Sequence, residues 1–404
     1  MTRVVRLARV VQAGSLCALL FLLPFAPAAV EMLFGVLLVG WLIEWFDSQS
    51  RAQSVWRHRM LRGVLITGAI YLAICALSIV VSDYPVKSLL GFVKKWVQYL
   101  LLFVIAADVM WRRPVIKKLL ALFACSSLLV VCEALVQELF GKGFIRGYRF
   151  SIYSRITGPY QNPSDLATYL MVIIPILLSY AVWCRRWFRW LIWALLLVLS
   201  VYLAKTQTVG AFLGLGAGLL VTILTHRSIR RAGTVLLVLA SLIGVGFLHH
   251  SGRLTQVLTA DDIGRADRVM MWKAALGMIK DRPILGHGLN TFMANYLKYW
   301  VGGERMPRYA HNCYLQVAAE TGLTGLAAFL AFLGMLFWHL IRRAIRSEAQ
   351  LAILLPGFIG GLLAFVVQAG VDTNFYSLRQ AVLFWVLAGV AVGLSEQPID
   401  SRNT

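Results

Sequence analysis

The stretch RGVLITGAIYLAICALSIVV, residues 62–81, decides what kind of fold this chain adopts. Apart from Arg62 at its start it carries no charge, and it is long enough for a helix to cross about 30 Å of hydrocarbon. Similar runs recur from end to end, and 59% of all residues are hydrophobic while only 14% are charged. Because a soluble domain does not have this composition, we expect an all-α polytopic membrane protein.

The apolar runs on both sides of this stretch predict about twelve transmembrane helices. They are residues 10–26, 28–46, 62–81, 87–107, 115–136, 165–183, 187–204, 208–225, 231–248, 312–340, 350–371 and 378–395. Arg3, Arg6 and Arg9 resemble the start of a signal peptide, but a second apolar run follows at once, so we expect no cleavage. Because these helices use nearly the whole chain, we predict a single membrane domain, residues 1–404.

The charges predict how these helices are oriented. An even number of spans places both termini on one side, and the positive-inside rule makes that side the cytoplasm of a bacterial inner membrane. Every inward segment before the C-terminal tail is basic, through Arg3, Arg6, Arg9, Arg51, Arg57, Arg59, Arg62, Arg112, Arg113, Lys117, Lys118, Arg185, Arg186, Arg189, Arg227, Arg230, Arg231, Arg342, Arg343 and Arg346. The short outward turns near Pro24, Asp83 and Asp372 contain no Lys or Arg.

Two outward connections are longer than turns, residues 137–164 and 249–311. The second contains the helical pattern ADRVMMWKAALGMIK, residues 266–280. Long connections of this kind usually carry function. We therefore expect residues 249–311 to form a partly helical periplasmic loop between the ninth and tenth helices, and part of the active site.

A second set of cations lies on the outward segments or just beneath them: Lys87, Lys94, Lys95, Lys142, Arg146, Arg149, Arg155, Lys205, Arg253, Arg265, Arg268, Lys273, Lys280, Arg282, Lys298, Arg305, Arg308 and Arg379. A solvated basic surface is one explanation, because long loops are exempt from the positive-inside rule. Lys94 and Lys95 lie inside the fourth helix, however, where an ammonium is costly unless it reaches a polar cavity. Together with Lys205 they indicate a cationic cleft that opens outward and suits a lipid pyrophosphate head group.

Other kinds of function fit the sequence less well. The six cysteines form no CxxC pair and have no metal-ligand spacing, so we expect packing residues and no metal site. The acidic residues do not lie at helix centres, as an ion-coupled transporter would require, nor as the close pair of a retaining glycosidase. We expect membrane lipids and a lipid-linked anion as partners, with no cofactor and no nucleic acid.

The motif GPYQNPSD, residues 158–165, precedes the sixth predicted helix. Pro163 fits a first helical turn, with Asn162 or Ser164 as its cap. The free N–H groups of such a helix start bind anions, although a cap without a ligand explains the pattern equally well. Asn162 is therefore a candidate substrate-binding residue.

A second motif surrounds His311, where the long outward loop becomes a helix. A lone histidine is more often structural, but an imidazole at the mouth of a basic cleft can act as general base on a sugar hydroxyl. Asp372 in the last outward turn is a candidate to orient this imidazole. Glu320 lies on the same helix as His311 but roughly 13 Å deeper, at about 1.5 Å per residue, so packing or pairing explains it better than chemistry.

Taken together, the chain resembles the O-antigen ligase and polymerase superfamily of bacterial envelope glycosyltransferases, and most closely the O-antigen ligases. The resemblance covers the whole architecture. Its sharpest element is His311-Asn312, nine residues, Gly322, two residues, Gly325. GPYQNPSDLATYL, residues 158–170, fits the other recurring stretch of that family, and the long loop before His311 sits where the family has its catalytic loop.

The resemblance implies a polysaccharide donor on undecaprenyl pyrophosphate and, for a ligase, an acceptor sugar of the lipid A core. It also implies that His311 and loop arginines are essential, with Arg268 the best match for one of them. A further family arginine is expected where this chain has Val209, so Lys205 or Arg265 would have to supply that charge.

The expected mechanism is a metal-independent, inverting displacement at the anomeric carbon. His311 would take the acceptor proton, while Arg268, Arg265 and the lysines of the cleft stabilise the departing pyrophosphate. Asn312 and Asp372 complete the predicted substrate-binding residues. Two alternatives stay open, an O-antigen polymerase whose acceptor is another lipid-linked glycan, and a lipid-linked oligosaccharide flippase or exporter.

Overall fold

The computed structural model describes residues 3–113, 115–151, 155–184, 186–225, 227–250, 252, 263–302, 306, 309–346 and 353–397, without the side chains of Arg186 and residues 263–266. Throughout these ranges the regular structure is helical, and the one β-bridge joins Lys142 to Arg149. The all-α fold predicted from the sequence is therefore confirmed.

Ten helices in the described ranges are long and apolar enough to cross a membrane. They are α1 (Arg3–Leu22), α2 (Pro27–Phe46), α4 (Arg62–Val80), the continuous α5 (Pro85–Gly91), η3 (Phe92–Val97) and α6 (Gln98–Arg112), α7 (Ile116–Phe140), α8 (Pro163–Trp183), α9 (Arg186–Lys205), α11 (Arg230–His250), α15 (Cys313–Arg346) and α17 (Leu378–Ser395). Two shorter apolar helices are α10 (Val209–Thr225) and α16 (Leu355–Gln368). Their positions agree with the twelve predicted spans, with ends shifted by a few residues.

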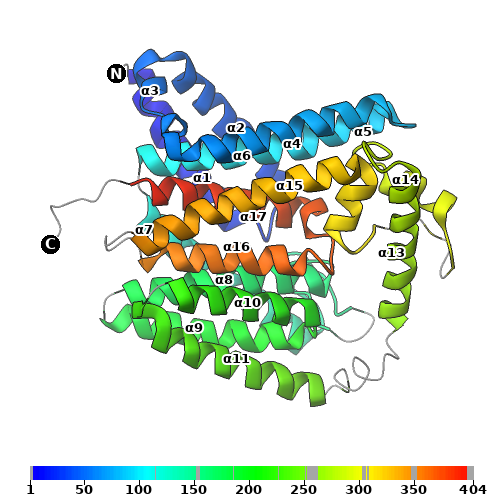
Figure 1. Cartoon of the computed structure of the whole chain (residues 1–404). Helices are drawn as coiled ribbons and strands as arrows, with labels where there is room; N and C mark the ends of the chain where they lie inside the picture. The colour runs from blue at the N-terminus through cyan, green and yellow to red at the C-terminus, as the bar shows by residue number, and fades with distance from the viewer. Residues whose placement is uncertain are drawn as a thin grey trace.

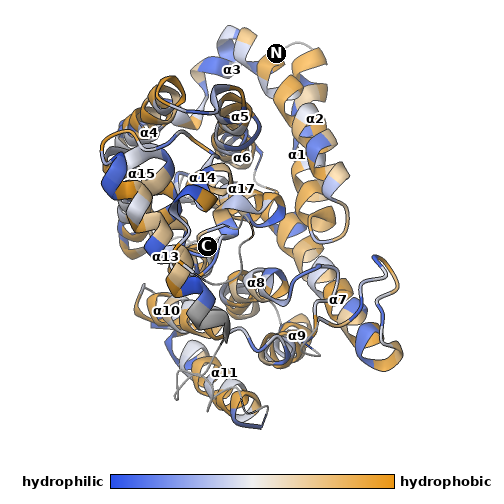
Figure 2. Ribbon diagram, turned by 90° about the vertical axis from the view of Figure 1, so that its right-hand side faces the viewer, coloured by the Kyte–Doolittle hydropathy of each residue, from blue (hydrophilic) through white to orange (hydrophobic). Residues whose placement is uncertain are grey.

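Most of these helices run side by side, and α13 (Ile263–Asp281) lies across one end of the bundle (Figure 1). We call residues 263–302 the cap; they also contain α14 (Phe292–Asn295) and η5 (Tyr296–Tyr299). This confirms the helical pattern predicted in the long connection. Seen from the cap, the bundle helices appear nearly end-on, with apolar residues over much of their surfaces (Figure 2).

The opposite end, which we call the terminal end, holds both described ends of the chain (Figure 1). It also carries the connection between α2 and α4, which contains α3 (Ser48–Ala52), η1 (Val55–Arg57) and η2 (Arg59–Leu61). The two ends of the bundle are therefore built differently, one by a folded cap and one by short basic connections.

Small residues set how closely the central helices pack. α10 packs on α16, where Gly218 and Gly360 face each other, and a methyl group added at either would collide with the backbone carbonyl of the other. α17 packs on α6 in the same way, with Gly389 and Gly393 against the carbonyls of Phe103 and its neighbours. Close backbone approach through small residues is how helices associate in lipid, where no hydrophobic force drives them together.

A break in α15 attaches the cap to the bundle. Gly322 has φ 73° and ψ 177°, which interrupts the helix. The backbone groups freed by this break bind the cap, since the N–H of Leu323 donates to the carbonyl of Pro283 at 2.7 Å. The N–H of Gly288 likewise donates to the carbonyl of Glu320 at 2.9 Å. The cap is therefore held to the membrane helix that begins beside His311.

Candidate active site

His311 lies directly before α15, at the cap end of the bundle. Its backbone has φ 46°, a left-handed conformation that is uncommon outside glycine. Its Nδ1 lies 3.6 Å from the Asp372 Oδ1 and has no hydrogen bond, and the side chain is 34% exposed. Nδ1 therefore faces the carboxylate, while the other ring nitrogen, Nε2, has no partner among the described residues.

Asp372 is fixed in the turn between α16 and α17. Cys313, the first residue of α15, accounts for much of this: its N–H donates to the carbonyl of Ala369 at 2.8 Å, and its thiol lies 3.2 Å from the carbonyl oxygen of Asp372. The N–H of Thr373 donates to Asp372 Oδ1 at 2.8 Å. The residues around Cys313 thus join two segments that are far apart in sequence and bring Asp372 to His311.

The environment of Asp372 favours its ionised form. Burial acts to raise the pKa of Asp372, but attraction to the adjacent imidazole of His311 opposes it. The N–H of Thr373 and the charge of Arg268 add to that opposition, and the net pKa is below the ordinary carboxyl value. The pair can therefore act as a base with its orienting carboxylate.

Arg268 projects from α13 of the cap and is partly buried. It is near enough to Asp372 to act on it electrostatically, so the cap, the start of α15 and the turn after α16 contribute to one group of charges. We call His311, Asp372 and Arg268 the histidine site. The side chain of Arg265, the third predicted catalytic residue, lies outside the described residues.

Lys95 approaches this region from η3, a π-helical segment that is wider than an α-helix. Its Nζ donates to Asn290 Oδ1 at 2.8 Å and lies 5.6 Å from the ring centre of Tyr376. The Tyr376 hydroxyl donates to Glu320 Oε2 at 3.1 Å, and Glu320 also accepts the N–H groups of Asn290 and Phe292 at 2.7 and 3.1 Å. Glu320 is buried and fully engaged in holding the loop beside Lys95.

The other predicted substrate-binding residues have different surroundings. Lys94 is exposed, so the structure separates it from Lys95. Asn162 caps α8 by accepting the N–H of Ser164 at 3.0 Å, and Asn312 caps α15 by accepting the N–H of Tyr314 at 3.0 Å. Direct contact of these three side chains with substrate stays a prediction.

Arg379, at the start of α17, links the GPYQNPSD motif to the histidine site. Its guanidinium lies 4.3 Å from the ring centre of Tyr160 and donates to the carbonyl of Pro159 at 3.0 Å. Asp165, in the first turn of α8, interacts electrostatically with both Asp372 and Arg379. The motif therefore borders the histidine site.

Lys205 ends α9 and forms an ion pair with Glu138 of α7. Tyr202, one turn earlier on α9, donates its hydroxyl to the same carboxylate at 3.3 Å. The charge of Lys205 is therefore largely balanced by Glu138. Its assignment as the replacement for the absent arginine stays a prediction.

Arg155 is a candidate that the sequence did not single out. Its Nε donates to the carbonyl of Thr206 at 2.6 Å and its Nη2 to Thr208 Oγ1 at 2.8 Å. These contacts bring a guanidinium to the start of α10, beside Val209, where the resemblance implies an arginine. No spacing in the sequence connects Arg155 to this helix, because the link exists only through the folded outward loop.

Unusual backbone conformations occur beside Arg155, Lys95 and His311. In the described part of the chain, the non-glycine residues with positive φ are Gln207 (51°), Asn290 (59°) and His311 (46°). Gln207 lies between the two partners of Arg155, and Asn290 is the partner of Lys95. Backbone conformations of this kind are retained where surrounding structure enforces them, and they cluster at active sites.

Comparison with known proteins gives two findings. Residues 194–330 match the family model described as O-antigen ligase. The chain is also similar to a protein of Rickettsia bellii (strain RML369-C) named "Putative polysaccharide ligase", with 26% identity over 276 residues. That similarity covers 64% of this chain and 64% of the relative, so the chain spans just under two thirds of the relative's length. The region matched by the family model contains Arg268 and His311 and ends before Asp372.

Proposed function

We propose, from the membership of this chain in the O-antigen ligase superfamily, that it transfers a polysaccharide from undecaprenyl pyrophosphate to a sugar of the lipid A core. The reaction would take place at the cap end of the bundle, on the periplasmic face of a bacterial inner membrane. The observation that carries this proposal is the histidine site, in which an imidazole faces a largely buried carboxylate that is also influenced by the charge of an arginine.

His311 is the proposed general base. Its Nδ1 is directed at Asp372, so Nε2 is the nitrogen that can accept the proton of the acceptor hydroxyl. The oxygen of that hydroxyl then forms a bond to the anomeric carbon of the donor as the bond to pyrophosphate breaks. The pyrophosphate leaves with the bonding electrons, and a single displacement inverts the anomeric centre.

Arg268 is the proposed partner of the leaving group, because negative charge grows on the pyrophosphate as the bond breaks. Arg155 and Lys95 would add positive charge from two other elements, the outward loop and the π segment of the fourth span. Guanidinium groups suit this task, since they bind phosphate oxygens through paired N–H donors. A pyrophosphate whose charge is met in this way leaves without a metal ion.

The test is glycan transfer by the purified protein from an undecaprenyl pyrophosphate donor to lipid A core, with a chelator present. We expect His311→Ala and Arg268→Ala each to lower kcat/KM by about 100-fold or more, the usual loss for a general base or an oxyanion donor. Arg155→Gln should lower it by less. Lys273→Ala is the matched control, because Lys273 is an exposed cation on the same helix as Arg268.

Two outcomes would contradict the proposal in different ways. Undiminished transfer by both His311→Ala and Arg268→Ala would remove the histidine site from the mechanism. A wild-type protein that ignores lipid A core but lengthens the glycan on its lipid carrier would instead support a polymerase.

A further inference from the structure

A second polar site lies at the terminal end of the bundle, remote from the histidine site. A pocket of about 510 Å³ opens there. It is lined by Arg9, Ala52, Gln53, Ser54, Arg57, His58, Trp111, Arg112 and Gln397. The lining contains three arginines and a histidine but no carboxylate, and it draws on four separate segments of the chain. We call it the arginine pocket.

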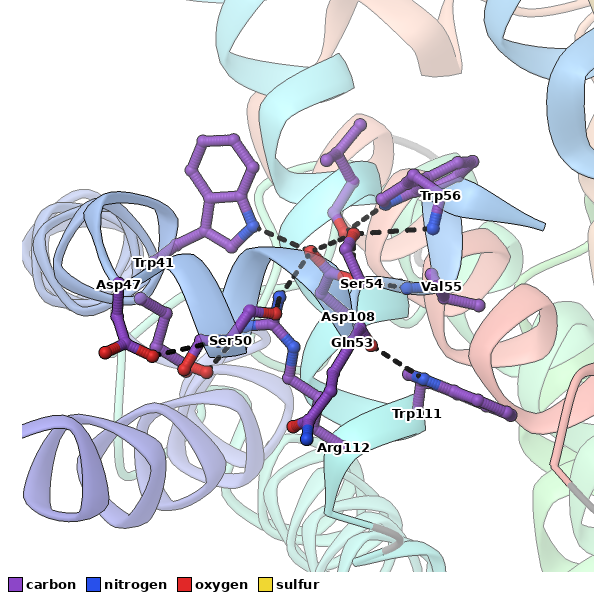
Figure 3. A network of polar contacts seen from close by, with 12 residues as sticks. Trp41, Asp47, Ser50, Gln53, Ser54, Val55, Trp56, Asp108, Trp111 and Arg112 are labelled. Carbon is purple, nitrogen blue, oxygen red and sulfur yellow. Dashed lines mark hydrogen bonds and ion pairs between the residues drawn. The ribbon is translucent and has the colours of Figure 1, made fainter. Parts of the chain in front are cut away.

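Carboxylates hold two of these arginines from behind the pocket wall. Glu44 is buried and accepts Arg9 Nε at 2.8 Å and Arg112 Nη1 at 2.5 Å. Asp108, also buried, lies 3.5 Å from Arg112 Nη2 and accepts Ser54 Oγ at 2.8 Å (Figure 3). The two guanidinium groups are thus fixed in place before any ligand arrives, which lowers the entropy cost of binding.

One arginine of the pocket is not engaged by the protein. Arg57 is exposed and makes no hydrogen bond or ion pair with any described residue. Its guanidinium N–H donors are therefore available to a ligand rich in acceptor oxygens.

Tryptophans surround the arginine pocket. Trp111 lines it, donates to the carbonyl of Gln53 at 3.0 Å and packs edge-on against His58 with ring centres 4.8 Å apart. Trp41 donates to Asp108 at 2.9 Å, just behind the wall. Tryptophan gathers at the level of the lipid head groups, where the most abundant anion is phosphate.

We infer that the arginine pocket binds a phosphate group, carried either by the head group of a membrane lipid or by a small soluble phosphate ester. Guanidinium groups from different directions match the several oxygens of a phosphate better than the two of a carboxylate. Arg57 carries a positive charge that no described carboxylate balances. Arg9 and Arg112 form a wall of the pocket and are already held in place by carboxylates. This site is independent of the proposed transfer reaction.

A basic cytoplasmic surface of the kind that the positive-inside rule describes would also attract phosphate. The affinity of such a surface would not depend on any particular arginine. The test therefore compares Arg57→Gln with Arg51→Gln in the full-length protein. Arg51 is also exposed in the same connection, but it does not line the pocket. Both changes remove one positive charge.

The measurement is the rise in Tm of delipidated protein in nonionic detergent as a probe is added, which yields Kd by mass action. One arm compares phosphatidylglycerol with diacylglycerol, which lacks the phosphate. The other arm compares inorganic phosphate with chloride at equal ionic strength. We expect Arg57→Gln to raise Kd about tenfold, as the loss of a charge-assisted hydrogen bond does. Arg51→Gln should leave Kd within about twofold, and Arg57→Lys should fall between.

The two arms separate the sources of the phosphate. Arg57-dependent binding of phosphatidylglycerol alone supports a lipid head group, and Arg57-dependent binding of inorganic phosphate supports a soluble ester. Equal Kd values for wild type and Arg57→Gln with both probes would overturn the inference. So would an equal loss in Arg51→Gln, or stabilisation by diacylglycerol as strong as by phosphatidylglycerol. If Arg57→Gln does not fold, the same comparison is made with Arg57→Lys.

Discussion

At the scale of single residues, the site depends on how His311 and Asp372 are held rather than on their identity alone. Asn312 caps α15 and so fixes the residue before it, while Cys313 binds the turn that carries Asp372. Asn312 accepts two backbone N–H groups, and Cys313 makes one backbone hydrogen bond and two weaker thiol contacts to the turn. Their combined effect is to point one ring nitrogen at a carboxylate and leave the other for substrate.

Asp372→Asn tests this arrangement, because it keeps the shape of the side chain and removes its charge. We expect kcat to fall by about 100-fold or more with little change in KM, since an amide cannot stabilise the imidazolium that forms as His311 takes a proton. Initial rates of glycan transfer, measured over a range of acceptor concentrations at saturating donor, give kcat and KM separately. Asp372→Glu should recover part of the rate, and an unchanged kcat in Asp372→Asn would exclude an orienting role.

The same variant carries a pH prediction. The folded pKa of Asp372 lies below its ordinary value of 3.8, so its ionised form stabilises the fold. That contribution is fully present above the ordinary value and is lost as pH falls through the folded pKa. The Tm difference between wild type and Asp372→Asn should therefore be constant near neutral pH and shrink in acid.

At the scale of elements, α15 is a membrane helix that is broken in order to hold the cap. Gly322 adopts φ and ψ angles that are essentially restricted to glycine, and a methyl group there would collide with the backbone carbonyl of Ile284. Gly286, on the loop that meets it, has φ 66° and packs against the backbone of Glu320. The break and the loop therefore depend on each other.

Gly322→Ala should lower the free energy of unfolding by at least about 1–3 kcal/mol, from backbone strain alone. It should also loosen the cap and reduce transfer. Gly334→Ala is the matched control on the same helix, because Gly334 has ordinary helical geometry with open space around it. There alanine should be neutral or stabilising by up to about 1 kcal/mol. Thermal unfolding in detergent measures both variants, and equal stability would show that the break tolerates a side chain.

At the scale of the whole molecule, the two ends of the bundle differ in construction. Asp83, in the turn between α4 and α5, holds the cap by pairing with Arg282 at 2.9 Å and Lys298 at 3.3 Å. Hydrogen bonding to Arg282 is the main cause that lowers the pKa of Asp83. The terminal end carries its arginines on short connections, and under the positive-inside rule we propose it as the cytoplasmic face.

Cysteine labelling in intact cells tests this orientation. Lys273→Cys on the cap should react with a membrane-impermeant maleimide added outside the inner membrane, whereas Arg59→Cys at the terminal end should react only after permeabilisation. Both positions are exposed, so access alone decides the result. The unsubstituted chain sets the background, because Cys125 and Cys132 on α7 are exposed, whereas Cys17, Cys75, Cys184 and Cys313 are buried. The reverse labelling pattern would invert the proposed topology.

The helical membrane fold, its approximate spans and the position of His311 at a helix start could all be predicted from the sequence. Each of these depends on local properties, such as the length of an apolar run or the residue types at a helix end. The spacing from His311 to Gly322 is also visible in the sequence. The structure explains it, because α15 is interrupted at Gly322 and the cap binds to the backbone there. Such features can be predicted because neighbours along the chain produce them.

Which charged groups meet depends on the tertiary fold. Arg155 reaches the start of α10 through a folded loop, and Lys205 pairs with Glu138. Lys95 binds Asn290, whereas its neighbour Lys94 is exposed. The arginine pocket likewise forms from segments far apart along the chain. These contacts depend on how helices pack, which small residues such as Gly218 determine through backbone proximity. No pattern within one segment encodes them, because each partner lies on a different element.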